Sequence, residues 1–244
     1  MFEQYNLQLV LLSYIISAMG SYAALQLVTA IPAAATRVER RRAILLAGVV
    51  LGAGAIWSMH FVGMLAFNMG MTVSYDVLGT LASVLVAVVA CTLGLAIVGT
   101  GEFNFDKLLP ASVFMGAGVA GMHYSGMASM LMPAEIDYDL NILIISVLIA
   151  VVAACAALWM AFNMRGTLQK LGSALLMGVA VCGMHYTGMA AATYRMTGVM
   201  PEAGWAGALS GDYIEVFVGT IVVAIAVLTL GVMRWYRQRP LLAV

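Results

Sequence analysis

The sequence predicts an all-α integral membrane protein in which seven helices cross a lipid bilayer. Of its 244 residues, 64% are apolar and 9% are charged, and the mean hydropathy is +1.02, far outside the usage of soluble proteins. Seven apolar runs each reach the roughly 20 residues that a spanning helix needs. The net charge of zero gives no reason to expect a nucleic-acid partner. The chain is expected to be a single membrane domain.

The seven predicted spans follow one another with short connections, so no soluble output domain is expected between them. The polar N-terminus lacks the basic segment of a signal peptide, and the first span is therefore expected to be retained. Polar segments separate the runs: 36–42, 100–108, 164–171 and, with glycine and proline, 196–212. The predicted spans are 7–31, 43–67, 77–99, 109–132, 141–163, 172–195 and 213–233.

The basic residues predict the orientation of these spans. Ten of the eleven lie in connections on one side of the membrane, and the other side carries Arg195 with most of the acidic residues. Because positively charged connections stay in the cytoplasm, the N-terminus is expected outside and the C-terminus inside. The ten are Arg37, Arg40, Arg41, Arg42, Lys107, Arg165, Lys170, Arg234, Arg237 and Arg239, and the acidic residues opposite include Glu3, Asp76, Glu135, Asp137, Asp139, Glu202, Asp212 and Glu215.

Every histidine of the chain occurs in the same six-residue motif. The steps between the three histidines are 63 and 62 residues, which indicates an internal repeat. All three motifs fall on parallel spans, the second, fourth and sixth, roughly 10–15 Å below the outer surface. The copies are Met59-His60-Phe61-Val62-Gly63-Met64, Met122-His123-Tyr124-Ser125-Gly126-Met127 and Met184-His185-Tyr186-Thr187-Gly188-Met189.

The repeat predicts the arrangement of the spans. Units made of spans two and three, four and five, and six and seven would be related in parallel, with the first span as an addition. The simplest packing is a pseudo-threefold bundle with the three histidine helices near its axis. Small residues seven positions before each histidine are expected to leave room beside the imidazole: Ala53, Gly116 and Gly178.

Imidazole and thioether groups at one depth indicate a metal site. At about 100° per residue, the methionine four residues after each histidine lies on the same helix face, whereas the preceding methionine points aside. We expect Met64, Met127 and Met189 to be the stronger candidates beside His60, His123 and His185, and Met59, Met122 and Met184 the weaker ones. Thioether ligands select Cu(I) and imidazole binds both copper oxidation states, so copper is the metal expected.

Two other interpretations stay open at this point. Methionines often only fill a core, and three buried histidines can form a hydrogen-bonded network instead of a metal site. Tyr124 and Tyr186 are expected to orient the site or to anchor it near the interface, and Cys182 is an optional ligand.

The triple motif resembles that of the MHYT family of bacterial integral-membrane sensor domains. Met184-His185-Tyr186-Thr187 matches the family's motif in full, while the copies around His123 and His60 depart at the later positions. The resemblance implies a bacterial membrane sensor that binds copper through the Met and His residues of the motif and detects oxygen, carbon monoxide or nitric oxide, with redox state as a further possible signal. With the predicted orientation, the metal is expected toward the periplasmic side of the inner membrane. The resemblance also implies a cytoplasmic output module, such as cyclic-di-GMP enzymes or a histidine kinase.

Nothing follows Val244, so either a fragment or a stand-alone protein that signals through a partner is expected, with a dimer among its possible states. Rival functions are copper transport or delivery and, less favoured, haem-based sensing. The spans contain no nucleophile–base pair, phosphate loop or paired carboxylates, so an enzyme is not expected: any catalysis would belong to an output domain.

Overall fold

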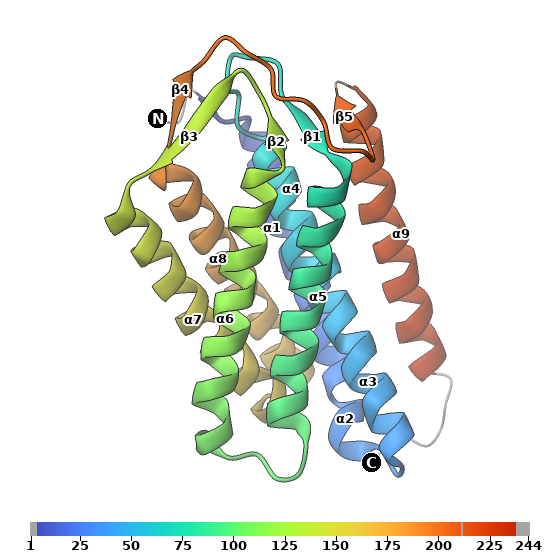
Figure 1. The fold of residues 1–244 in the computed structure, drawn as a ribbon. Helices are drawn as coiled ribbons and strands as arrows, with labels where there is room; N and C mark the ends of the chain where they lie inside the picture. Colours follow the sequence, from blue (N-terminus) through green and yellow to red (C-terminus); the bar gives the residue numbers. More distant parts are fainter. Residues whose placement is uncertain (1–3, 211, 238–244) are drawn as a thin grey trace.

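The computed structural model describes residues 4–210 and 212–237. Glu3, Arg239 and the predicted cytoplasmic end of the chain lie outside the described residues. Long helices run side by side, and short strands form a layer across one end of the bundle (Figure 1). The helices are α1 Leu7–Val28, α2 Ala30–Ala33, α3 Arg37–Val49, η2 Val50–Trp57, α4 Ser58–Leu65, α5 Val77–Gly99, α6 Phe105–Ala128, α7 Leu140–Asn163, α8 Thr167–Ala191 and α9 Asp212–Arg237.

Within the described residues, five helical stretches are long and apolar enough to cross a membrane: α1–α2, α3–η2–α4, α5, α7 and α8. The second is one continuous span, in which the π-helix η2 joins two α-helices. Helix α6 has 24 residues but is less apolar, because glycines, serines and His123 dilute it. The molecule is therefore a multi-pass helical membrane protein.

The strands correct two predicted spans. The runs expected to continue to residues 132 and 195 end as helices at Ala128 and Ala191, and the chain then pairs as strands. The β-branched and aromatic residues of this region suit strands, and pairing between segments distant in sequence satisfies the backbone. The strands are β1 Ser74–Asp76, β2 Met130–Leu131, β3 Ala134–Tyr138, β4 Ala192–Met196 and β5 Ala208–Ser210; one antiparallel sheet has the order β2-β1-β5, and β3 pairs with β4.

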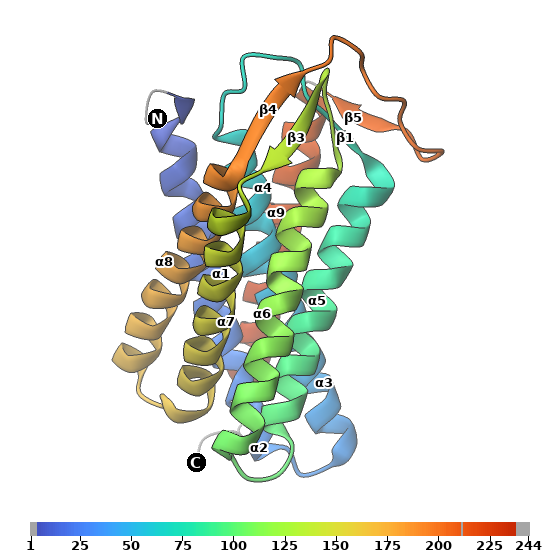
Figure 2. The ribbon, with the colours of Figure 1, turned by 60° about the vertical axis from the view of Figure 1, so that its left-hand side comes forward.

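Six helical spans close into a ring around the bundle axis. The three histidine-bearing spans are inner, and each outer helix packs between two of them: α5 between η2 and α6, α7 between α6 and α8, and α1 between α8 and η2–α4. Helix α9 packs outside this ring, against α1, η2 and α4 (Figures 1 and 2). The pseudo-threefold arrangement is as expected, but the third unit pairs span six with span one. The prediction that span one is the addition was wrong.

A repeated start on the outer helices explains this order. Helices α1, α5 and α7 each follow a tyrosine and an Asn or Asp that caps the helix. Asn6 accepts hydrogen bonds from two backbone N–H groups of the first turn, Asp76 from one and Asp139 from two, which stabilises each helix N-terminus. The three starts, Tyr5-Asn6, Tyr75-Asp76 and Tyr138-Asp139, lie 70 and 63 residues apart.

Small residues bring inner and outer helices together. A Cβ added to Gly116 would lie 2.7 Å from the backbone nitrogen of Val151 on α7, and one on Gly178 would lie 3.0 Å from the ring of Tyr14 on α1. These glycines therefore serve helix packing. The expectation that they leave room beside the imidazoles was wrong, because their face of the helix is turned to an outer helix.

Candidate metal centre

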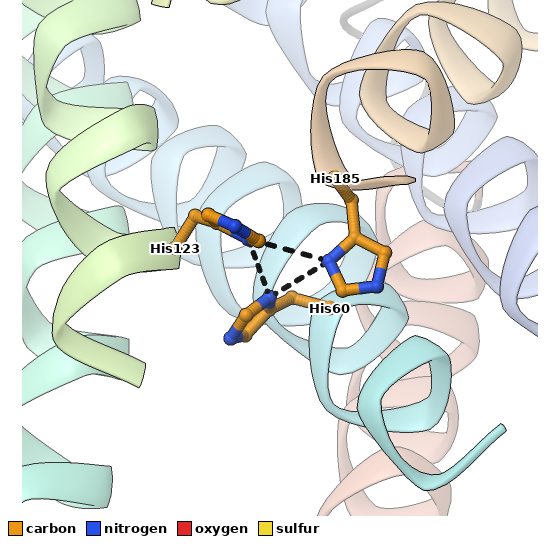
Figure 3. A group of neighbouring side chains, drawn as sticks. All are labelled: His60, His123 and His185. Carbon is orange, nitrogen blue, oxygen red and sulfur yellow. Dashed lines mark hydrogen bonds between the residues drawn. The ribbon is translucent and has the colours of Figure 1, made fainter. Parts of the chain in front are cut away.

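The three histidines meet at a single point inside the bundle. His60 lies on α4, His123 on α6 and His185 on α8, five or six residues before each helix ends, about 8 Å below those ends. Their Nδ1 atoms form a triangle with sides of 3.0, 3.1 and 3.3 Å, as Figure 3 shows. All three side chains are buried. The three histidines, expected near the bundle axis, therefore form one cluster shared by three helices; its role as a metal site stays a prediction.

A closed triangle of imidazole nitrogens cannot satisfy itself by hydrogen bonding. Each Nδ1 carries either a proton or a lone pair. Because three Nδ1 atoms share only two possible states, at least two of them must both be donors or both be acceptors. One contact therefore stays repulsive in every protonation state, in a buried place where an unsatisfied polar group is costly.

The donor set fits a single cation instead. A triangle with these sides has its centre about 1.8 Å from each corner, near the 2.0–2.1 Å of a typical zinc–imidazole bond. If the Nδ1 lone pairs point to the centre, the protons belong on Nε2. All three Nε2 atoms are buried without a hydrogen-bond partner in the described part of the chain. Among the described His, Cys, Asp and Glu residues, these three histidines form the group with ligand spacing.

The six motif methionines are all buried, at 0–4% exposure. They are Met59, Met64, Met122, Met127, Met184 and Met189. Met184 also lines an apolar cavity between the inner helices and α7. Their role as ligands stays a prediction. Cys182 on α8 is a free, half-buried thiol, and it is outside the group with ligand spacing formed by the histidines.

An aromatic ring follows each histidine and contacts it edge-on. The ring centroids of His60 and Phe61 are 5.2 Å apart, and those of His123–Tyr124 and His185–Tyr186 are 4.7 Å apart. Each aromatic ring is supported in turn by the tyrosine at the start of an outer helix, at 5.4–5.7 Å: Phe61 by Tyr75, Tyr124 by Tyr138 and Tyr186 by Tyr5. The aromatic residues therefore pack against the imidazole rings; the orienting role expected for Tyr124 and Tyr186 stays a prediction.

Serines of the outer helices complete this support. Tyr124 shares a hydrogen bond of 2.6 Å with Ser146 on α7, and Tyr186 one of 3.0 Å with Ser13 on α1. In the first copy, where Phe61 has no hydroxyl, Trp57 donates to Ser83 on α5 instead, at 3.0 Å. Sequence reasoning missed these serines, although they lie 70 and 63 residues apart, as the helix starts do.

The strand layer lies across the end of the bundle that is nearer to the histidines (Figure 1). Burial raises the pKa of Tyr138 on β3 to about 12, so this tyrosine stays a neutral phenol beside Tyr124. Arg195 on β4 pairs with Glu135 and lies 3.5 Å from Asp137 on β3, at the exposed surface of the hairpin. Charges therefore face solvent, while neutral aromatic groups face the histidines.

The cavity below the site is apolar. Its lining comes from η2, α6, α7 and α8, and includes Met115, Val119, Ala154, Met177 and Met184. Because no carboxylate or hydroxyl lines it, this cavity suits small apolar molecules better than ions.

Comparison with known proteins identifies the repeat. The model of the MHYT family, described as a bacterial signalling protein N-terminal repeat, matches residues 54–111 and 116–174. The chain is 39% identical over 236 residues to the bifunctional diguanylate cyclase/cyclic di-GMP phosphodiesterase MucR of Pseudomonas aeruginosa, covering 94% of the chain and 33% of the relative. It is 35% identical over 193 residues to the cyclic di-GMP phosphodiesterase NbdA of the same organism, with 77% and 24% covered.

A third relative is the signaling protein YkoW of Bacillus subtilis, 32% identical over 198 residues, which are 78% of the chain and 24% of the relative. The chain thus spans a third or less of the length of these relatives. No solved structure matches it. The family match covers the first two histidine motifs, and the third has the same sequence pattern and joins the same cluster. The chain belongs to the MHYT family of bacterial signalling proteins.

Proposed function

We propose that the chain is an integral-membrane sensor domain that binds one copper ion through His60, His123 and His185. The observation that carries this proposal is the triangle of Nδ1 atoms, which a hydrogen-bonded network leaves unsatisfied and a central cation satisfies. Bound copper would supply a redox-active centre with affinity for small ligands. The protein residues hold the imidazoles in place and exclude water from them.

Copper is favoured over zinc by charge as well as by donor type. Three neutral imidazoles leave the full charge of the ion in an apolar interior, where uncompensated charge is costly. A monovalent Cu(I) ion brings half the charge of Zn²⁺. The buried motif methionines are soft donors that also select Cu(I), and Met64, Met127 and Met189 are the ones we propose as additional ligands.

We propose seven spans in the inner membrane, with the N-terminus and the metal centre toward the periplasm. The strand layer carries Glu135, Asp137 and Arg195, whereas the arginine-rich start of α3 and the connection before α6 lie at the opposite end of the bundle (Figure 1). This distribution supports a cytoplasmic location for the arginine-rich end.

A diatomic gas or a change of redox state is the proposed signal. The apolar cavity next to Met184 gives an uncharged molecule space beside the site. Output through a cytoplasmic signalling protein or domain is supported by MucR and NbdA, whose names state cyclic-di-GMP activities. Catalysis is assigned to such a module and not to this chain.

The two rival functions receive less support. A porphyrin between two histidines needs more room than nitrogens 3.0–3.3 Å apart leave, which disfavours haem. Copper transport needs ligands repeated at successive depths, and the cavity below the histidines is lined by apolar groups, with Met115, Met177 and Met184 as its soft donors and no further histidine. Sensing therefore accounts best for a single buried cluster.

Elemental analysis and EPR of protein purified in mild detergent test the proposal. Expression with ample copper should yield about one copper ion per chain, as expected for one three-histidine centre. The His123→Ala/His185→Ala variant should lose it, because one imidazole is left. Carbon monoxide added to the reduced protein should give a C–O stretching band in the infrared if the centre binds gas.

Metal-free protein from copper-replete cells would overturn the metal proposal. Stoichiometric zinc in place of copper would keep the site but refute its redox role. Copper retained by the double variant would place the ion elsewhere.

A further inference from the structure

Each histidine ring rests against a glycine of the next histidine-bearing helix. A Cβ added to Gly126 on α6 would collide with Nε2 of His60 and lie 3.1 Å from its Cδ2. The same holds between Gly188 and His123, at 2.9 Å from Cδ2, and between Gly63 and His185, at 2.8 Å from Cδ2. Each of these glycines lies three residues after its own helix's histidine, and the third contact closes the circle.

The rings have little freedom to avoid such a collision. On one side the Nδ1 atoms are 3.0–3.3 Å from one another, and on another an aromatic ring lies edge-on at 4.7–5.2 Å. The histidines are 0–1% exposed. A methyl group at the glycine would therefore push Nδ1 out of the triangle rather than into open space.

We infer that Gly63, Gly126 and Gly188 are positioning residues of the metal centre, which act as a collar around the three imidazoles. The collar seats the Nε2 side of each ring on a neighbouring helix backbone, so that Nδ1 faces the centre. It also makes each histidine's position depend on the next helix. This inference rests on the proposed function for its metal, but the packing that it describes exists without one.

The first test compares glycine-to-alanine variants. Gly126→Ala and Gly188→Ala should weaken copper affinity by roughly 10–100-fold, the usual effect of losing support around metal ligands. Gly183→Ala is the matched control: it lies on α8, two residues before His185, and nothing lies within 4 Å of its added Cβ. Alanine has a higher helix propensity than glycine. A loss of copper affinity in Gly126→Ala or Gly188→Ala therefore has to come from the collision with the histidine ring.

The second test needs no metal. In metal-free protein, the thermal midpoint of Gly126→Ala is measured alone and combined with His60→Ala or with His185→Ala. His60→Ala removes the ring that Gly126 touches and should abolish the loss caused by Gly126→Ala, whereas His185→Ala keeps that ring and should relieve much less of the loss. An equal loss in both backgrounds would overturn the positioning role.

The two proposals fail in different ways. Wild-type protein without copper, together with a specific rescue by His60→Ala, would refute the metal and leave the collar standing. Copper-loaded wild type with a Gly126→Ala variant of equal affinity would refute the collar and leave the metal site standing. Gly188→Ala with His123→Ala repeats the cycle at another corner if Gly126→Ala does not fold.

Discussion

Each imidazole begins a short series of side-chain contacts that ends on an outer helix. His123 contacts Tyr124 edge-on, and the Tyr124 hydroxyl is 2.6 Å from Ser146. The first copy keeps the ring but not the hydroxyl, since Phe61 stands there and Trp57 reaches the serine instead. The aromatic contact is thus the common element, and the hydrogen bond to serine adds to it.

Ser146→Ala should destabilise the protein by about 0.6 kcal/mol, the average measured for hydrogen bonds between membrane helices. The change leaves the Tyr124 hydroxyl without its partner. In the Tyr124→Phe/Ser146→Ala variant both polar groups are removed, and most of the loss should disappear. Unfolding in mixed detergent micelles measures both. A Ser146→Ala effect that persists in the Tyr124→Phe background would contradict the pairing.

At this scale the sequence predicted the histidine cluster but not the residues that support it. The 63- and 62-residue steps place three histidines at one depth, and an ionisable group inside a membrane already indicates a function. The glycine three residues after each histidine was visible in all three copies. Its role was not, because the ring that it accommodates belongs to another helix, and the rotation of that helix follows from packing.

Among the elements, η2 distinguishes the first histidine helix from the other two. Ala55 contacts Gly20 of α1, and Gly118 contacts Ala90 of α5 in the same way. Ala55 and Gly118 each lie five residues before the histidine of their own helix. The next contact below differs: Gly52, eight residues before His60, meets the backbone of α5, whereas Gly116 is seven residues before His123. The first copy therefore holds one extra residue between these contacts, and a π-turn absorbs it.

Deleting Ala53 should convert η2 to α-helix and leave His60 in place, so the variant should keep its copper. The spacing would then equal that of the other copies. Deleting Ala117 from α6 is the control: in a regular helix the loss of one residue rotates one half against the other by about 100°, which separates Gly116 from its contact or His123 from the triangle. Copper content reports both outcomes, and loss of copper from the Ala53 deletion would contradict the assignment of the extra residue.

The starts of the outer helices α1, α5 and α7 were easier to predict than the ends of α6 and α8. Asn6, Asp76 and Asp139 are local caps that the sequence carries next to each apolar run. The ends at Ala128 and Ala191 depend on strand pairing, such as that of Ile136 with Tyr194, between segments about 60 residues apart. Hydrophobicity along the chain does not contain that information.

In the whole molecule, the ring of six spans is closed by α1, and α9 stays outside it. The sequence predicted span one as an addition to the repeats, because span one carries no histidine motif. Tyr5, Asn6 and Ser13 carry the outer-helix pattern and would have placed it correctly. The prediction overlooked them because it followed the histidine motifs and not the residues that support them.

The orientation of the whole bundle is testable with single cysteines in a cysteine-free background. Arg41 on α3 and Asp137 on β3 are both exposed, and the start of α3 and strand β3 lie at opposite ends of the bundle (Figure 1). In intact cells, a membrane-impermeant thiol reagent should label Asp137→Cys, whereas Arg41→Cys should be labelled after the inner membrane is permeabilised, since positively charged connections stay inside. The reverse pattern would place the histidine cluster toward the cytoplasm.

The extra residue in η2 has a consequence for how a signal could leave the triangle. If the three histidine helices were identical, the triangle would expand or contract equally along all three, and no direction in the bundle would be preferred. The corner at His60 differs from the others in its helix, and α9 packs against the same helix. A change at the centre would therefore meet a different resistance at the His60 corner than at the other two.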